Sequence, residues 1–230
     1  MDKQDLGLVL IVVLVLGYTG YAIAQPFQSP GVGGGGGTSP AEQDFRDCIY
    51  TFRVDGSTYL AKKGDSSGKK YSDTSGTTLI SNAITDGGAG LYCFQKGTFL
   101  AVISPLPVST GVHLRGAGIG VTIIQQPANT NGDVISGSSL TDITITDLSI
   151  DGNKANNPTG DNGISFTSLT GGRIERVESY NNILKGFVFS DTCSNILINE
   201  VESHSNDQDG IALTSGTIAS GLVCRDVTIA

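Results

Sequence analysis

Apolar residues recur along the C-terminal half of the chain in a pattern that repeats about every two dozen positions. The stretch Ile143–Ile150 alternates apolar with small or polar residues, and related stretches follow at 174–179, 196–203 and 222–229. Aligning these stretches places four apolar residues in one core column: Leu148, Val177, Val201 and Val227. An alternation of period two is typical of half-buried strands, so each repeat is predicted to contain at least one strand.

A second short stretch keeps the same period, at Gly163–Phe166, Gly186–Phe189 and Gly210–Leu213. Each repeat therefore holds several strands that are too short to bury a core alone. Stacking the repeats pairs equivalent strands in parallel, about 4.8 Å apart, and creates one continuous core. The pattern predicts an all-β fold, a parallel β-helix (solenoid).

One polar column supports the same alignment. Asn153, Asn182 and Asn206 are spaced in the same way as the core positions Leu148, Val177 and Val201, each lying five places after its core residue. Stacked asparagine side chains at a turn can hydrogen-bond along the column, so we expect an asparagine ladder between coils.

The segment 1–41 is expected to lie outside this fold. Apolar residues dominate 6–24, where Ala22-Ile23-Ala24 has the small-x-small form of a signal-peptidase site. A length of about 19 residues also suits an uncleaved membrane anchor, so a cleaved signal peptide and a retained anchor both stay open. The five consecutive glycines Gly33–Gly37 indicate a flexible linker. The predicted segments are a signal or anchor, a linker, a cap region and the coils: 1–24, 25–41, 42–90 and 91–230.

A short helix is predicted to cap the first coil. Residues 77–85 place apolar side chains on one helical face before Gly87-Gly88 ends the segment: Leu79, Ile80, Ala83 and Ile84. Such a helix covers the open end of a solenoid core. The first coil strands are expected at 98–102, 112–114 and 121–124.

The other end of the solenoid carries no recognisable cap. The sequence stops at Ala230, directly after Ile229, which the repeat places in an inward position. An uncapped coil exposes its core and a strand edge, which predicts a fragment or a subunit that stacks on a partner.

The net charge and the cysteines bear on the binding partners and the compartment of the protein. The chain has 14 Lys+Arg against 22 Asp+Glu, a net charge of −8, so we expect no binding to nucleic acid. None of the four cysteines forms a CxxC pair. In an exported protein, a disulfide between Cys48 and Cys93 would tie together the segment before the repeats, although the pairing stays open. Cys224 aligns with Ile198 and is expected to point inward.

Three characteristic stretches precede the repeats: Gly-Thr-Phe-Leu at 97–100, Ser-Thr-Gly-Val-His-Leu-Arg-Gly-Ala-Gly at 109–118 and Val-Thr-Ile-Ile at 121–124. They resemble the opening coils of pectate-lyase-like right-handed β-helix proteins. An Asp-Gly-Ile turn of the kind that recurs in that superfamily lies at 209–211. The resemblance covers about Tyr59–Ala230 and implies a right-handed helix. The superfamily includes polysaccharide lyases, polygalacturonase-like hydrolases, epimerases, phage tailspikes and surface proteins without known catalysis.

The catalytic motifs of that superfamily match this chain incompletely. Polygalacturonase-like enzymes carry paired aspartates, Gly-His-Gly and Arg-x-Lys, and the nearest counterparts are Asp207, Asp209 and His204, the last without its glycines. Arg173-Ile174-Glu175 stands in place of the basic pair, and the arginine-centred signatures of pectate lyases are missing. Two carboxyl groups about 5–10 Å apart can cleave a glycosidic bond, and Asp207 and Asp209 could meet that spacing. Asp207, Asp209 and His204 are therefore the predicted catalytic residues. The alternative is an ordinary polar turn.

Two further columns carry charge on the outer surface. Glu178 aligns with Glu202 about 4.8 Å away, and the repulsion between the two carboxylates favours a bound cation, for which calcium is the candidate. Another column alternates in charge and predicts a surface ladder of ion pairs: Asp147, Arg176, Glu200 and Asp226.

Two classes of function follow. In the first, the chain is a polysaccharide lyase or glycoside hydrolase that acts through an acid such as Asp207 or Asp209. In the second, it is a non-catalytic adhesin or a structural protein of a surface or envelope. In either case we expect an extracellular or cell-surface protein whose partner is a polysaccharide or surface glycan, held at the membrane if its N-terminal helix is retained.

Overall fold

The computed structural model describes residues 47–65, 67–100, 105–214 and 223–229. All of them belong to the compact unit Glu42–Ala230, and the other unit, Met1–Ala41, lies outside them. The predicted signal or anchor and the predicted linker therefore fall outside the described residues. Within the described ranges, no helix combines the length and the apolarity needed to cross a membrane.

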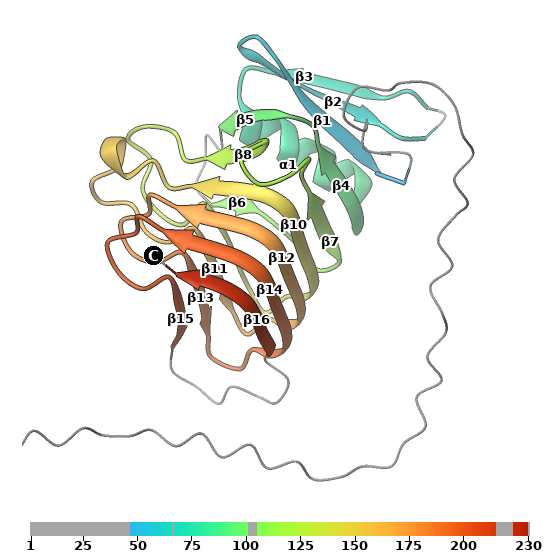
Figure 1. The fold of residues 1–230 in the computed structure, drawn as a ribbon. Helices are drawn as coiled ribbons and strands as arrows, with labels where there is room; N and C mark the ends of the chain where they lie inside the picture. The colour runs from blue at the N-terminus through green and yellow to red at the C-terminus, as the bar shows by residue number, and fades with distance from the viewer. Residues whose placement is uncertain (1–46, 66, 101–104, 215–222, 230) are drawn as a thin grey trace, which may run out of the picture. The chain divides into compact units, whose positions relative to one another are not determined.

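Two sheets whose coil strands run parallel form the walls of a solenoid (Figure 1). The larger sheet runs in the order β16-β14-β12-β10-β7-β4-β1-β2-β3, with β5 and β8 joined to it beside β10. Its coil strands are β4 (Gly90–Phe94), β5 (Gly97–Leu100), β7 (Val112–Arg115), β8 (Thr122–Gln125), β10 (Thr141–Asp151), β12 (Thr170–Tyr180), β14 (Ser194–His204) and β16 (Val223–Ile229). The second sheet consists of β6 (Leu106–Pro107), β9 (Ile135–Ser138), β11 (Ile164–Thr167), β13 (Phe187–Ser190) and β15 (Ile211–Thr214). The parallel β-solenoid predicted from the repeats is confirmed.

The strand register matches the alignment of the repeats. Ile145 pairs with Ile174, and Ile174 pairs with Ile198, which in turn pairs with Cys224. The three isoleucines are fully buried, whereas the side chain of Cys224 lies outside the described part. One contiguous apolar core therefore runs through the stacked coils, as the period-two pattern requires.

The N-terminal cap combines the predicted helix with three antiparallel strands at one end of the larger sheet. β1 (Tyr50–Asp55) pairs antiparallel with β2 (Thr58–Lys63), which pairs antiparallel with β3 (Lys70–Asp73). Helix α1 (Gly76–Gly87) begins at the N-cap Ser75 and ends at Gly88, whose φ of 72° favours glycine. Its apolar face is buried as expected: Leu79, Ile80, Ala83 and Ile84. The helix is confirmed, and the antiparallel strands are an element that the repeat pattern did not reveal.

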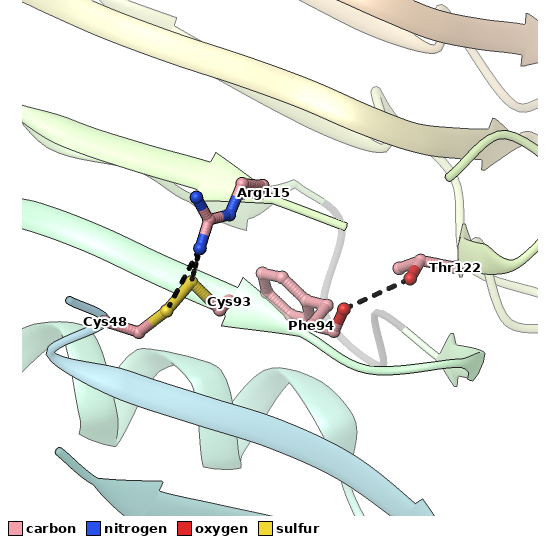
Figure 2. Close-up of a disulfide and its surroundings, with 5 residues drawn as sticks. All are labelled: Cys48, Cys93, Phe94, Arg115 and Thr122. Atoms are coloured by element: carbon pink, nitrogen blue, oxygen red, sulfur yellow. Dashed lines mark hydrogen bonds between the residues drawn. A yellow bond between two sulfur atoms is a disulfide. The ribbon is translucent and has the colours of Figure 1, made fainter. Parts of the chain in front are cut away.

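A disulfide joins Cys48, which precedes β1, to Cys93 in β4, with a Cα–Cα distance of 5.8 Å. Figure 2 shows Arg115 of the neighbouring strand β7 pointing toward this bond. Its Nη2 lies 3.7 Å from Cys48 Sγ and 3.5 Å from Cys93 Sγ. The pairing left open by the sequence is therefore the one that fastens the cap to the first coil.

The asparagine ladder forms over only part of its predicted length. Asn206 Oδ1 accepts hydrogen bonds from the backbone N–H and from Nδ2 of Asn182, at 3.0 and 2.7 Å. The prediction was wrong for Asn153, which takes a left-handed conformation with φ of 48° before the short 3-10 helix Lys154–Asn156. Its Nδ2 donates instead to the carbonyl of Gln126. Asn182 Oδ1 is consequently buried without a hydrogen-bond partner among the described residues.

The last described coil is open. Ile229 pairs with Ser203, which is buried, yet Ile229 itself is 59% exposed because no described strand lies beyond β16. The register of Ile229 is thus as predicted. A stacking partner at this end stays a prediction.

The cap depends on one carboxylate, which makes its stability sensitive to pH. Asp86 near the end of α1 accepts hydrogen bonds from Lys69, from Tyr50 Oη at 2.7 Å and from Lys63 Nζ at 3.0 Å. These partners, Lys69 first, hold the pKa of Asp86 well below its ordinary value. The stabilisation is therefore fully present above about pH 4 and is lost as the pH falls through the lowered pKa of the folded state.

Urea unfolding of the parent chain and of Asp86→Asn, from about pH 7 down to about pH 2, checks this expectation. We expect the parent to be the more stable near neutral pH and its advantage to shrink below about pH 4. An advantage that stays constant over the whole range would contradict the role given to Asp86.

Candidate functional site

A bend in three adjacent strands creates an outward-facing polar surface. Asp147, Arg176 and Glu200, in the middle of β10, β12 and β14, have φ values of 59°, 51° and 51°. Each of these residues adds one position to the alternation of inward and outward side chains. In β10, for example, Ile143 and Ile145 point inward before the bend, and Leu148 and Ile150 point inward after it. The intervening side chains of the second half of each strand consequently lie on the outer face of the sheet.

Two columns of side chains cross this outer face. Ser149 pairs with Glu178, and Glu178 pairs with Glu202. Beside them, Asp151 pairs with Tyr180, and Tyr180 pairs with His204. Parallel pairing without a shift holds these side chains at the spacing of neighbouring strands.

The centre of this surface is a cluster of three side chains, Glu178, Tyr180 and His204, which we call the outer-face cluster. His204 Nε2 lies 3.0 Å from Glu178 Oε1, and Ser149 Oγ donates to Glu178 Oε2. The rings of Tyr180 and His204 stack, with centroids 5.4 Å apart and an interplanar angle of 14°. The cluster stays accessible, because the His204 side chain is 35% exposed and that of Glu178 is 17% exposed.

The phenol of Tyr180 is partly buried and lies near two carboxylates. The pKa of Tyr180 is raised to about 12, first by burial and then by the charges of Asp151 and Glu178. Asp151 is itself buried and accepts hydrogen bonds from Gln125 Nε2 at 2.6 Å and from the backbone N–H of Asn153 at 2.8 Å. The phenol of Tyr180, which is neutral near pH 7 even at the ordinary tyrosine pKa, is thus a hydrogen-bonding group on the outer face.

This arrangement offers two kinds of chemistry. A carboxylate within hydrogen-bond distance of an imidazole can share or transfer a proton, as a general acid or base does. Stacked rings with hydrogen-bonding edges offer an apolar face together with polar atoms, which suits a ligand that has both.

The predicted catalytic residues are only partly brought together. His204 lies in the outer-face cluster and contacts Glu178, a residue predicted for metal binding. Asp207 and Asp209 lie in the turn between β14 and β15, where Asp207 Oδ1 is 2.7 Å from Lys154 Nζ. Asp209 Oδ2 is 4.0 Å from Lys185 Nζ, and both carboxylates are more than half exposed. A catalytic role for the two aspartates stays a prediction.

Of the predicted surface ladder of ion pairs, the pair of Asp147 and Arg176 forms, whereas the side chain of Asp226 lies outside the described part. The Arg176 guanidinium binds Asp147 at 2.6 and 3.1 Å and Glu175 at 2.9 Å, and Arg173 also pairs with Glu175. The Asp147 carboxylate is the main cause that raises the pKa of Arg176. Burial alone would raise the pKa of Glu175, but Arg173 and Arg176 outweigh it and lower the pKa. Glu200 accepts instead from Asn199 Nδ2 at 3.1 Å.

Calcium binding between Glu178 and Glu202 stays a prediction. The two residues are neighbours in register, as predicted, but both oxygens of Glu178 already contact Ser149 and His204. Calcium takes about 6–8 oxygen ligands, and the described residues contain no group of three or more His, Cys, Asp or Glu side chains placed to hold a metal.

Three contributors to this surface were not singled out from the sequence: Ser149, Asp151 and Tyr180. The signal was present, because Tyr180 and His204 lie one repeat apart, and so do Ser149 and Glu178. Reading the outward columns in the same way as the inward ones would have placed them together.

The fold and the site define a parallel β-solenoid with a polar, partly aromatic cluster on the outer face of its larger sheet. No family model matches the chain, and no curated protein matches it. Among solved structures it is similar to the A-module of the mannuronan C-5 epimerase AlgE4 from Azotobacter vinelandii, with 17% identity over 66% of this chain and 53% of that chain and a TM-score of 0.45.

Two further solved structures are similar. The catalytic domain of a GH87 alpha-1,3-glucanase in complex with nigerose shares 12% identity over 84% of this chain and 36% of that chain, with a TM-score of 0.49. ORF18 of Geobacillus virus E2 shares 17% identity over 68% of this chain and 38% of that chain, with a TM-score of 0.42. The chain thus spans 53% or less of each of these proteins. The fold assignment rests on the strand register of the chain itself.

Proposed function

We propose that this chain is a carbohydrate-interacting protein that holds a saccharide against the outer-face cluster of β12 and β14. The observation that carries the proposal is the stacked, accessible pair of Tyr180 and His204 with the Glu178 carboxylate 3.0 Å from the imidazole. A sugar ring presents apolar C–H groups on its faces and hydroxyl groups at its edge. The aromatic rings suit the apolar C–H groups, and the carboxylate, imidazole and phenol suit the hydroxyl groups.

The proposed setting is extracellular or at a cell surface. The disulfide between Cys48 and Cys93 supports it, because disulfides persist in oxidising compartments. The apolar segment 6–24 supplies the export signal in this proposal, and a retained helix would keep the protein at the membrane.

Titration of the full chain with oligosaccharides from pectin, polygalacturonate, alginate and a neutral glucan tests the binding. We expect Tyr180→Leu and His204→Ala each to weaken binding by about threefold to tenfold, because each removes one ring of the stacked pair. Leu197→Ala is the matched control, since Leu197 is half-buried on the outer face of the first half of β14. Equal affinities for the parent and both ring variants would refute the proposal.

A second candidate function is cleavage of the bound saccharide, which the contact between His204 and Glu178 favours. In this case Glu178→Gln and His204→Ala each lower the release of reducing ends or unsaturated uronates by about 100-fold or more. Asp207→Asn and Asp209→Asn test the other candidate catalytic residues, which the family motifs suggested. If these two variants lose turnover and Glu178→Gln and His204→Ala do not, the chemistry lies in the turn after β14. Absence of turnover on every substrate leaves binding as the function.

A further inference from the structure

The antiparallel strands of the cap place lysines directly opposite one another. Lys62 of β2 pairs with Lys70 of β3, and the backbone N–H of Lys63 donates to the carbonyl of Lys69 at 2.9 Å. Like charges opposite each other on an antiparallel pair are destabilising. Each of these two lysine pairs is therefore a place where a bound anion would relieve repulsion.

The pair Lys63 and Lys69 has such an anion within the chain. The Asp86 carboxylate lies between them, with Oδ2 3.0 Å from Lys63 Nζ and Oδ1 bonded to Lys69 Nζ. Tyr50 Oη adds a third hydrogen bond to the same carboxylate. The structure thus contains its own example of a carboxylate held by a cross-strand lysine pair.

The neighbouring pair, Lys62 and Lys70, points to the opposite face of the strands, since successive side chains alternate. Both residues are exposed, and neither ammonium group makes an ion pair or hydrogen bond with any residue that the structure describes. Arg53 is adjacent on β1, and its guanidinium lies 3.7 Å from Asp55 of its own strand. Three cations therefore gather on one face of a chain whose net charge is −8.

These cations border a cleft. Its volume is about 580 Å³, within the range of small-molecule sites. Its lining includes Thr51, Arg53, Lys62, Lys70, Ser72 and Gln95. Hydroxyl and amide groups thus lie beside the cations, and these are the groups that hydrogen-bond to sugar hydroxyls.

We propose that this cleft binds a saccharide that carries a carboxylate, with Lys62 and Lys70 holding the carboxylate as Lys63 and Lys69 hold Asp86. The cleft lies on β1, β2 and β3, whereas the outer-face cluster lies on β12 and β14. The proposal therefore names a second binding site, on elements that the proposed function does not use.

Calorimetric titration of the full chain with oligogalacturonate at low salt tests the cleft, with Tyr180→Leu and His204→Ala present in every variant so that the outer-face cluster contributes little. We expect the added substitutions Lys62→Gln and Lys70→Gln together to weaken binding by about tenfold or more, because two charge-assisted contacts are lost. The charge-preserving changes Lys62→Arg and Lys70→Arg, and the distant Lys185→Gln, should retain the affinity. Binding should also weaken between about 0.05 and about 0.5 M salt.

The same oligomer with its carboxyl groups reduced to alcohols is the matched ligand and should bind at least about tenfold more weakly. Unchanged affinity of the Lys62→Gln and Lys70→Gln variant would overturn the proposal, and so would equal binding of the reduced oligomer. Inorganic phosphate or sulfate that binds as tightly as the oligomer would overturn the assignment to a saccharide. Because both lysines are exposed, adding Lys62→Gln and Lys70→Gln to the ring double variant should not lower its thermal unfolding midpoint. Failure here leaves the ring-variant test of the proposed function unaffected, and the reverse also holds.

Discussion

Replacing both Cys48 and Cys93 by serine is expected to lower the free energy of unfolding by about 4 kcal/mol. The disulfide joins residues separated by 45 positions, and in the chain-entropy account a loop of this length restricts the unfolded chain by about that amount. The midpoint of thermal unfolding should fall by roughly 10 °C for a domain of this size. Urea unfolding of the oxidised parent and the double variant, followed by circular dichroism, measures the difference.

The reduced parent is the control for this experiment. Its stability should approach that of the double serine variant, because both lack the same covalent link between the cap and β4. Cys193 is free and buried, so Cys193→Ser serves as a matched substitution that leaves the disulfide intact. A double variant as stable as the oxidised parent would show that the cap does not depend on this bond.

Truncating the core of the central coils should have an effect of similar size. Phe166 of β11 is fully buried and lies next to Phe189, with ring centroids 6.4 Å apart and ring planes tilted by 35°. Phe166→Ala is expected to cost about 3–5 kcal/mol, since it removes apolar contacts and leaves a cavity. Denaturant unfolding gives the value from the shift of the midpoint at constant slope.

Leu213 provides the matched position for this prediction. It continues the same column, because Phe166 pairs with Phe189 and Phe189 pairs with Leu213, yet it is 41% exposed. Leu213→Ala should therefore cost about 1 kcal/mol or less. If Phe166→Ala and Leu213→Ala lowered the free energy of unfolding equally, this would contradict a core that is closed at its centre and open at the last described coil.

The repeat made the solenoid predictable because every coil reuses the same inward positions. Leu148, Val177 and Val201 align in the sequence as one column, and the observed register places the strands that carry them side by side in that alignment. Helix α1 was predictable for a related reason, since its apolar residues follow a helical period and Gly88 ends it. Elements that do not repeat lacked this support, and the strands β1, β2 and β3 were accordingly missed.

The site was harder to predict because its geometry depends on backbone conformations that cannot be predicted from the residue types. Arg176 adopts a positive φ, which shifts the side chains after it by one position and turns Glu178 and Tyr180 outward. Asn153 adopts one too, and this removed it from the predicted ladder. The opposition of Lys62 and Lys70 likewise depends on the register of a hairpin that was not predicted. His204 was predicted from its likeness to the histidine motif of polygalacturonase-like enzymes. Its partner Glu178 was predicted only as a cation ligand, from its alignment with Glu202.

The most direct test of the proposed function is a crystal structure of the full chain with the oligosaccharide that binds it most tightly. The account predicts a sugar ring packed against Tyr180 and His204, with a hydroxyl group within hydrogen-bond distance of Glu178. A second molecule in the cleft beside Lys62 and Lys70 is compatible with this result. A saccharide bound elsewhere, with the outer-face cluster of β12 and β14 left bare, would contradict it.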